Sequence, residues 1–178
     1  MEILVHTCCG PCATYVFQKL LKDGHRPMSF YYNPNIYPQR EYNKRKEVAK
    51  EYLAELGVGW VEGEYRPKDY LQAIGENTKQ PGRCLKCYQL RLSQTAQEAK
   101  KGEFEAFSTT LLISPYQDQV KLREVGTKLS QKYKVKFYEE NFRVGYRKSR
   151  GIAGQRGMYQ QKYCGCKYSL KEKNTNFG

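Results

Sequence analysis

Seven cysteines in three tight groups set the first condition on the fold of this 178-residue chain. The groups lie near the start, in the middle and near the end: Cys8, Cys9 and Cys12; Cys84 and Cys87; Cys164 and Cys166. An odd number of thiols cannot pair off completely, and a free cysteine that only fills a core needs no second cysteine nearby. Thiolate ligation is the favoured interpretation, because soft sulfur ligands select zinc, copper or iron–sulfur clusters. The fold must then bring three distant stretches of chain together.

The spacing within the groups argues against an ordinary zinc site. Structural zinc is usually held by two Cys-x2-4-Cys pairs, and Cys84 with Cys87 fits one such pair. Three sulfurs crowd into residues 8–12, and a single residue separates Cys164 from Cys166. Seven donors also overfill one tetrahedral site. A cluster with three or four thiolates, beside a second metal held by the rest, uses the cysteines better.

Short apolar stretches alternate with helical patterns along most of the chain. The pattern predicts strands at 2–6, 26–32, 58–62, 104–110 and 135–138, and helices at 12–22, 39–56, 67–74, 83–101 and 118–132. This alternation indicates an α/β fold with three layers, a parallel sheet covered by helices on both faces. We expect a single domain over residues 1–178, with a basic, irregular C-terminal segment at 139–178.

Ligands of parallel α/β sheets bind at the carboxyl ends of the strands. The first cysteine group lies on the turn after the first strand, and the loop after Thr109 and Thr110 should open on the same edge. Asp118 could ligate a metal or donate a proton there, or it could simply cap the following helix. Tyr116 could supply a proton to a leaving oxygen, or pack against the loop. The turn at residues 6–12 has no phosphate-loop pattern, so we expect no nucleotide cofactor.

The chain is strongly basic, with 31 Lys and Arg against 18 Asp and Glu and a formal net charge of +13. Residues 139–178 carry nine basic and three acidic residues, interleaved with aromatic ones. Cations beside rings are typical of proteins that bind RNA loops, although a charged stretch can also be a solvated surface. The charged helix at 39–56 has mixed signs and is interpreted as surface. The RNA-binding candidates are Arg143, Arg147, Lys148, Arg150 and Arg156, with Tyr146 and Tyr159.

No apolar run approaches the roughly 20 residues of a membrane-spanning helix. The first residues also lack the basic start and the long apolar stretch of a signal peptide. We therefore expect a cytoplasmic protein with no membrane partner. Structural disulfides are disfavoured in that compartment, so the fold should not depend on them.

Five motifs follow one another between residues 6 and 166. They are His6-Thr7-Cys8-Cys9-Gly10-Pro11-Cys12, Tyr32-Asn33-Pro34-Asn35-Ile36, Arg83-Cys84-Leu85-Lys86-Cys87-Tyr88, Thr109-Thr110-Leu111-Leu112-Ile113-Ser114-Pro115-Tyr116-Gln117-Asp118 and Gln161-Lys162-Tyr163-Cys164-Gly165-Cys166. Taken together, they resemble the cobalamin-independent epoxyqueuosine reductases of the QueH type. The resemblance spans nearly the whole chain, and no cysteine position departs from the family pattern.

The resemblance implies an adenine-nucleotide-α-hydrolase-like (Rossmann-like) fold and an oxidoreductase of tRNA processing. This enzyme would complete queuosine biosynthesis by removing the epoxide oxygen of epoxyqueuosine in the tRNA anticodon loop, leaving an alkene. It would use a [4Fe–4S] cluster, an additional iron ion and an external electron donor. We expect Cys9, Cys84 and Cys87 on the cluster, and Cys8, Cys12, Cys164, Cys166 and Asp118 around the second metal or a bridge to it. The segment 139–178 would pack on the active site.

Two other functions fit parts of the pattern. A zinc-stabilised tRNA-binding module without catalysis would use the same basic residues and hold one or two structural zinc ions. A tRNA sulfur-transfer enzyme would carry persulfide on its cysteines, but it would normally activate the base with ATP, and the phosphate loop for that step is missing.

Overall fold

The centre of the fold is a sheet of five parallel strands. The computed structural model describes residues 1–175, apart from the side chains of residues 174 and 175. The strands are β1 (Glu2–His6), β2 (Arg26–Tyr31), β3 (Gly59–Glu62), β4 (Ala106–Thr109) and β5 (Lys136–Phe137). Their order in the sheet is β3-β2-β1-β4-β5, so the first strand of the chain lies in the middle.

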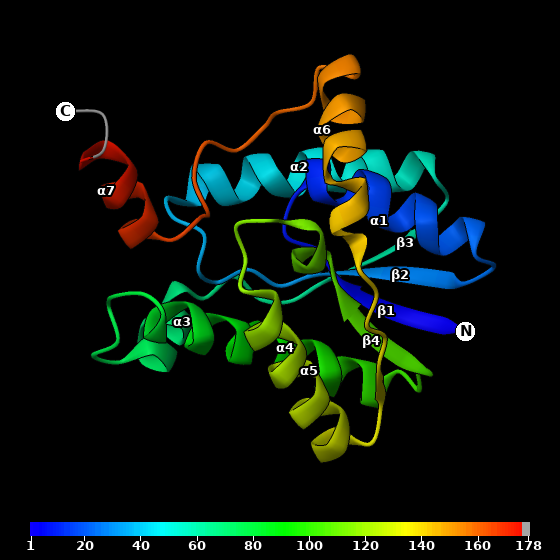
Figure 1. The fold of residues 1–178 in the computed structure, drawn as a ribbon, viewed down its shortest axis with the longest axis horizontal. Coiled ribbons are helices and arrows are strands. Elements are labelled where there is room, and N and C mark those ends of the chain that lie inside the picture. Colours follow the sequence, from blue (N-terminus) through cyan, green and yellow to red (C-terminus); the bar gives the residue numbers. More distant parts are fainter. Residues whose placement is uncertain (176–178) are drawn as a thin grey trace.

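Helices cover both faces of this sheet (Figure 1). They are α1 (Gly10–Lys22), α2 (Gln39–Glu55), α3 (Pro67–Ile74), α4 (Gly82–Lys101), α5 (Gln119–Tyr133), α6 (Tyr146–Gln155) and α7 (Lys167–Thr175). One face carries α1 and α2, and α6 packs against α1; the other face carries α4 and α5, with α3 beside α4. The three-layer α/β arrangement predicted from the sequence is confirmed.

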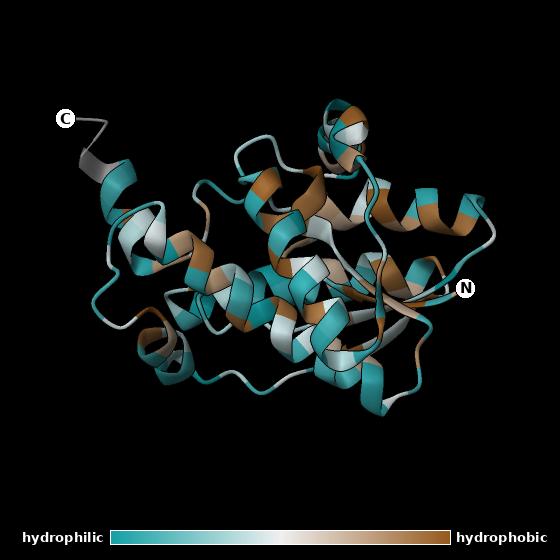
Figure 2. Cartoon of the chain, turned by 60° about the horizontal axis from the view of Figure 1, so that its bottom comes forward, coloured by the Kyte–Doolittle hydropathy of each residue, from teal (hydrophilic) through white to brown (hydrophobic). Residues whose placement is uncertain are grey.

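Apolar side chains fill the space between the sheet and the helices. Ile3, Leu4 and Val5 of β1 are at most 1% exposed, as expected for a strand covered on both faces. The buried residues of α1 include Ala13, Val16, Phe17 and Leu20, whose spacing places them along one side of the helix. Brown hydrophobic residues accordingly face the sheet in Figure 2, while teal residues lie outside. Within residues 1–175, we find no helix both long and apolar enough to cross a membrane.

The elements predicted up to residue 138 are all present, with ends shifted by at most two residues. Two other expectations were wrong. The predicted loop after β4 contains a short 3-10 helix (Thr110–Ile113), and the C-terminal segment expected to be irregular forms a second 3-10 helix (Phe142–Gly145) and then α6 and α7. Because only Ser149 and Ala153 of α6 are buried, its sequence carries almost no apolar period. Residues 176–178 of that segment lie outside the described part of the chain.

The start of α6 approaches α1 closely because Gly145 has no side chain. A Cβ atom on this glycine would lie 2.1 Å from the ring of Tyr15. One turn further on, the hydroxyl groups of Thr14 and Ser149 are 3.2 Å apart, so the two helices also meet through small polar side chains. This contact places the basic helix α6 beside the turn that carries the first cysteine group.

Buried hydrogen bonds join the carboxyl ends of neighbouring strands. Nδ1 of His6, at the end of β1, lies 2.9 Å from Oγ1 of Thr109, at the end of β4. Nε2 of His6 lies 3.1 Å from Oδ1 of Asn33, which follows β2. Burial, and secondly the charge of Arg91, lower the pKa of His6 to about 3, so the imidazole is neutral. This network fixes the sheet edge at which the cysteines lie.

We expect Gly145→Ala to destabilise the packing of α6 on α1. The added methyl group would overlap the Tyr15 ring, and overpacking of this kind typically costs about 1–3 kcal/mol. Gly151 lies in the same helix with open space around it, so Gly151→Ala should instead raise the free energy of unfolding by up to about 1 kcal/mol. Urea unfolding followed by circular dichroism measures both, and equal stabilities of the two variants would contradict the packing.

Candidate metal centre

The first thiol group lies where β1 passes into α1, with Cys8 and Cys9 in the turn and Cys12 in the first turn of the helix. The Sγ atoms of Cys8, Cys9 and Cys12 lie within 4.8 Å of one another, and each residue is at most 9% exposed. Metal–thiolate bonds of about 2.3 Å allow two sulfurs on one ion to be up to about 4.6 Å apart, so this spacing is close to that of a single-ion site. Among the described residues, no other three ligand atoms of Cys, His, Asp or Glu lie this close together.

Cys8 is the most acidic thiol of this group. Hydrogen bonds from Cys12 and then Cys9 lower its pKa well below 9, and the Thr110 hydroxyl, 3.2 Å from Cys8 Sγ, lowers it further. The pKa of Cys12 is raised, first by its hydrogen bond to Cys8. For Cys9, the hydrogen bond with Cys12 lowers the pKa, but the bond with Cys8 and burial outweigh it and raise the pKa to about 12. A bound cation would favour ionisation of all three thiols.

The other four cysteines line a second region, a cavity of about 280 Å³. Cys84 and Cys87 lie at the start of α4, three residues apart and therefore on one side of the helix. Cys164 and Cys166 come from the segment between α6 and α7. Burial raises the pKa of Cys87 to about 12 and also raises that of Cys84, and the two later thiols raise both further. The middle and the end of the chain thus meet, as the cysteine pattern requires.

Nearby donors favour the ionised form of individual thiols. Burial opposes ionisation of Cys166, yet its pKa is lowered, because hydrogen bonds from Ser169, together with the nearby Tyr70 hydroxyl and the charge of Arg83, outweigh the burial. The backbone N–H of Ser169 lies 3.4 Å from Cys166 Sγ. In the first group, Nε2 of Gln161 donates to Cys9 Sγ at 3.0 Å. Such donors orient thiolates and stabilise their charge.

A buried arginine attaches the end of the chain to this region. Arg45 of α2 is 3% exposed, and its Nη1 and Nη2 donate to the carbonyl oxygens of Cys164 at 2.9 Å and Tyr163 at 3.0 Å. Its Nε donates to Oε1 of Glu41 at 2.7 Å, which neutralises the guanidinium. The position of Cys164 is therefore set by the side chain of Arg45, which lies 119 residues earlier in the sequence.

A second arginine holds α7. Arg83 is 2% exposed, and its Nη1 and Nη2 donate to the two carboxylate oxygens of Glu172 at 2.8 and 3.0 Å. This two-point geometry is the strong form of an arginine–carboxylate pair. Because Arg83 precedes Cys84 and α7 begins directly after Cys166, the pair holds the two cysteine stretches beside each other.

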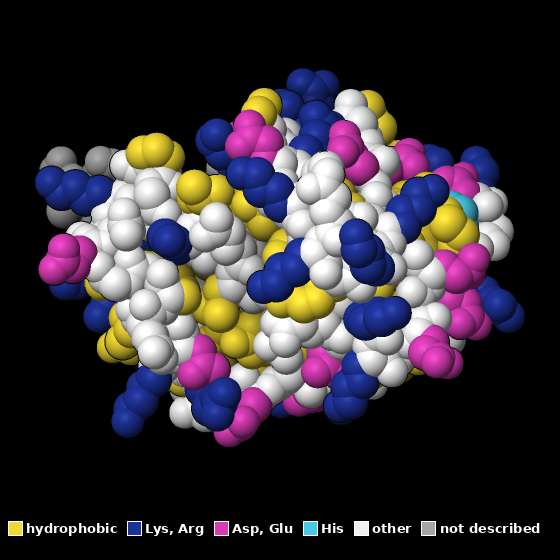
Figure 3. All heavy atoms as spheres, turned by 90° about the horizontal axis from the view of Figure 1, so that it is seen from below, with side chains coloured by type: hydrophobic (Ala, Val, Ile, Leu, Met, Phe, Trp, Pro, Cys, Tyr) yellow, Lys and Arg dark blue, Asp and Glu magenta, His cyan; other side chains and the backbone are white. Residues whose placement is uncertain are grey.

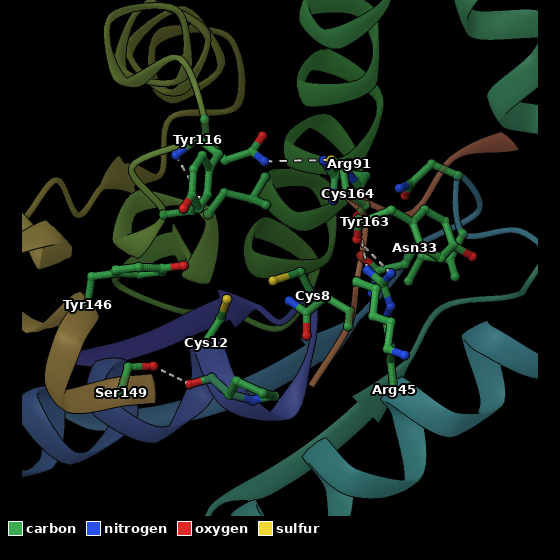
Figure 4. Close-up of a pocket in the computed structure, with 18 of the residues that line it drawn as sticks. Cys8, Cys12, Asn33, Arg45, Arg91, Tyr116, Tyr146, Ser149, Tyr163 and Cys164 are labelled. Carbon is green, nitrogen blue, oxygen red and sulfur yellow. Dashed lines mark hydrogen bonds between the residues drawn. The ribbon is translucent and has the colours of Figure 1, made fainter. Parts of the chain in front are cut away.

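A larger cavity of about 430 Å³ lies beside the first thiol group. Cys8 and Cys12 face it from the β1–α1 turn, and Tyr116 and Tyr146 lie across from them (Figure 4). The two rings meet edge to face, with centroids 6.1 Å apart. Sulfur ligands on one side and aromatic rings on the other give this cavity both a reactive wall and a surface on which a base can stack.

The two cavities join at five residues that line both: Asn35, Arg91, Tyr116, Gln117 and Cys164. Asn35 and Arg91 are each 3% exposed. Burial lowers the pKa of Arg91, but the nearby thiols, Cys87 foremost, outweigh it and raise the pKa, so the guanidinium carries its charge among sulfurs. Oδ1 of Asn35 has no hydrogen-bond partner among the described residues. The junction therefore presents a cation and an unused acceptor to a polar ligand.

The structure brings the predicted thiols together, in groups that differ from the expected ligand sets. The sequence predicts Cys9 with Cys84 and Cys87, but Cys9 lies in the first group. It predicts Cys164 and Cys166 at the second metal or at a bridge to it; both line the second cavity, and Cys164 also lines the first. All seven cysteines are free thiols, as expected.

Asp118 and Tyr116 both reach the cavities. Oδ1 of Asp118 accepts a hydrogen bond from the backbone N–H of Lys121 at 3.0 Å, which makes Asp118 the cap of α5. The same residue lines the second cavity, so capping and a role in the site are compatible. Tyr116 is 83% exposed and is not packed against its loop.

Most of the RNA-binding candidates lie on or near α6. Residues 142–155 contain four Lys or Arg and no acid. Arg150 and Tyr146 line the first cavity. The remaining basic side chains of this stretch are exposed: Arg143, Arg147 and Lys148. A cationic surface therefore borders the cavity.

Two further candidates are engaged within the protein. Arg156 pairs with Glu55, and the hydroxyl of Tyr159 donates to Oε2 of Glu41 at 2.6 Å. On the face seen in Figure 3, Lys and Arg are dispersed among Asp and Glu. The stretch at 142–155, which has no acid, is therefore the better candidate for contact with RNA.

Three buried polar residues of the site were not predicted. Arg45 lies in the helix that we interpreted as surface, and that interpretation was wrong for both Arg45 and Glu41, which are buried. No local signal marks the contact of Arg45 with the site, because the carbonyl groups that it binds lie more than 100 residues away. Arg91 could have been found, since it follows Cys87 by four residues and so shares its side of α4. Asn35 stands within one of the motifs.

A family model described as "Epoxyqueuosine reductase QueH" matches residues 3–172. The chain belongs to the QueH family. Proteins named epoxyqueuosine reductase QueH from Thermotoga maritima and Dehalococcoides mccartyi are 38% and 34% identical to it. The alignments cover 96% and 97% of this chain, and 91% and 94% of those QueH proteins. A QueH protein from Streptococcus pyogenes is 32% identical over 96% of this chain and 71% of its own.

Solved structures of other proteins share the fold of this QueH chain. A predicted tRNA methyltransferase subunit from Methanocaldococcus jannaschii matches with a TM-score of 0.61 and 16% identity, covering 86% of this chain and 74% of that one. The U34-tRNA thiolase NcsA from Methanococcus maripaludis, solved with its [4Fe-4S] cluster, matches with a TM-score of 0.60 and 17% identity, covering 94% and 61%. These likenesses confirm the Rossmann-like fold.

We expect Arg45→Met to release the segment around Cys164. Losing the guanidinium removes both hydrogen bonds to the Tyr163 and Cys164 carbonyls and leaves Glu41 buried without its cation. The backbone N–H of Tyr37, which donates to Gly165 at 2.8 Å, should then exchange with deuterium faster. Hydrogen exchange measured by mass spectrometry checks this, with Arg40→Met on the exposed side of the same helix as control. An unchanged exchange rate at Tyr37 would contradict the claim that Arg45 holds the segment around Cys164 in place.

Proposed function

We propose that this protein is an oxidoreductase that reduces epoxyqueuosine in tRNA to queuosine. The observation that carries the proposal is the convergence of free thiols from three stretches of a QueH-family chain: six of the seven line two joined cavities, and Cys9 lies beside Cys8 and Cys12. Removal of the epoxide oxygen to leave an alkene consumes two electrons and two protons and releases one water. An external donor would supply the electrons.

The donor set fits a [4Fe–4S] cluster and an additional iron ion, because soft thiolates are the ligands such groups take. Sulfurs on one ion lie closer together than sulfurs on the separate irons of a cluster. The compact first group therefore supports a single iron there, and the four thiols of the second cavity support the cluster. We propose this division in place of the ligand sets that we expected from the sequence. Asp118 remains a candidate ligand through the carboxylate oxygen that does not cap α5.

When bound, the cluster would deliver electrons singly and the iron would act as a Lewis acid toward the epoxide oxygen. The remaining tasks fall to the chain itself. Tyr116 and Tyr146 offer ring faces on which the modified base can stack. Arg91 can donate hydrogen bonds to a substrate oxygen, and Oδ1 of Asn35 can accept one from a substrate hydroxyl. The Tyr116 hydroxyl would supply a proton to the departing oxygen.

The anticodon loop of tRNA would lie over α6. Arg143, Arg147 and Lys148 are exposed beside the cavity and can contact phosphates, which fixes the position of the loop without reading its sequence. A tRNA substrate and seven free thiols both suit a reducing compartment, and we therefore place the protein in the cytoplasm.

The direct test is turnover. Anaerobically loaded protein is incubated with tRNA that carries epoxyqueuosine and with a chemical reductant, and the digested nucleosides are analysed. We expect epoxyqueuosine to be replaced by queuosine. A protein that binds this tRNA without turnover, contains only zinc and unfolds with a chelator would instead be the zinc-stabilised module.

Cys84→Ala should abolish cluster content and reductase activity while the fold persists. The side chain is half-buried and is one of four thiols at the second cavity, so its loss removes a ligand without opening the main core. Iron and acid-labile sulfide analysis, turnover and circular dichroism are compared with those of Ser93→Ala, a change further along the same helix and outside both cavities. Activity that survives Cys84→Ala would exclude this ligand.

Reversing the charge of Arg147 and Lys148 together should weaken tRNA binding. Each lost phosphate contact should reduce the slope of log K against log salt by about 1. Fluorescence anisotropy at several salt concentrations measures both quantities. The matched control is the double reversal of Lys100 and Lys101, exposed residues at the far end of α4. An equal loss in the control would mean that only net charge matters.

A further inference from the structure

One buried hydroxyl group in the second cavity makes no hydrogen bond to any other described residue of the protein. Tyr70 of α3 is 3% exposed, and its hydroxyl has no hydrogen-bond partner among the described residues. The ring packs in a small cluster with Ile74, Cys87 and Cys166. Tyr70 also lines the cavity that contains all four thiols of the second group.

An unpartnered buried hydroxyl is costly, because it has lost its hydrogen bonds to water without replacement. Phenylalanine would fill the same space without that cost. Two of the polar groups around it are engaged elsewhere: the Ser169 hydroxyl donates to the Cys166 carbonyl at 2.8 Å, and both Nη atoms of Arg83 donate to Glu172. A group that fills the cavity can supply the partner that Tyr70 lacks.

The hydroxyl is suited to donate. A tyrosine has an ordinary pKa of about 10, so its phenol keeps its proton at neutral pH. Its nearest ionisable neighbours are two thiols, Cys87 and Cys166, and one cation, Arg83. An acceptor that fits here is negatively charged and sulfur-rich.

We propose that Tyr70 is a positioning residue whose hydroxyl donates a hydrogen bond to a sulfur of the iron–sulfur cluster held at the second cavity. The proposal rests on the proposed function, because it needs the cluster. Hydrogen bonds to cluster sulfurs spread the negative charge of the reduced state and raise the reduction potential. Tyr70 thereby makes the cluster easier to reduce by the external donor.

The test is Tyr70→Phe, which removes one oxygen atom and leaves the ring. In the loaded protein, we expect a lower midpoint potential in a redox titration followed by electron paramagnetic resonance. At a fixed potential, the ratio of reduced to oxidised cluster should fall about tenfold, equivalent to about 59 mV for a one-electron couple. In the metal-free protein, the free energy of unfolding should stay unchanged or rise, because no hydrogen bond is lost.

Tyr52→Phe is the matched control, because it should show the opposite pattern. Tyr52 is 2% exposed on the other face of the sheet, and its hydroxyl donates to the Thr14 carbonyl at 3.3 Å and accepts from Gln18 at 3.0 Å. Its replacement should destabilise the metal-free protein and leave the potential unchanged.

Two results would overturn the proposal. One is an unchanged potential in Tyr70→Phe at full cluster content. The other is a loss of stability in metal-free Tyr70→Phe equal to that of Tyr52→Phe, which would mean that the hydroxyl has a partner within the protein. Failure of the proposed function is distinguishable from both, since it appears in the unaltered protein as an absence of iron.

Discussion

The candidate metal centre depends on the buried guanidinium of Arg45. Its three nitrogens are used on the carboxylate of Glu41 and on two consecutive carbonyl oxygens, so it holds the backbone at Tyr163 and Cys164 directly. Removing one partner of such a buried pair typically costs about 3–5 kcal/mol, because the other charge stays buried and uncompensated. The thiols of the last group would otherwise be free to move away from the sheet edge, and the second cavity would lose half of its sulfur.

The parallel sheet positions the remaining parts of the candidate site. Parallel strands end at a common edge, so the turn after β1 and the loop after β4 meet there without any special contact. The neutral imidazole of His6 stabilises this edge of the sheet, because it forms hydrogen bonds with both Thr109 and Asn33. Seven thiols in so small a volume repel one another once ionised, and Arg91 places a positive charge between the two groups. The same position makes Arg91 available to a substrate oxygen.

Features of the fold that depend on neighbouring residues could be predicted from the sequence, whereas features that depend on contacts between distant residues could not. The strands and helices up to residue 138 follow from local apolar periods, and the parallel sheet follows from their alternation. The convergence of the cysteines was predicted from their number and spacing. Their division into three and four was not, because it depends on contacts of Arg45 with Cys164 and of Arg83 with Glu172, which span 119 and 89 residues. The helix α6 was missed because it packs through Gly145 and Ser149 rather than through apolar side chains.

Iron bound at both thiol groups is the central claim. Mössbauer spectroscopy of anaerobically prepared protein loaded with ⁵⁷Fe tests it most directly, because it separates cluster irons from a single thiolate-bound ion. The account predicts two iron environments with areas in a ratio of about four to one, the composition of a [4Fe–4S] cluster and one further ion. A protein that takes up zinc but no iron, or iron in a single environment outside the thiols, would contradict it.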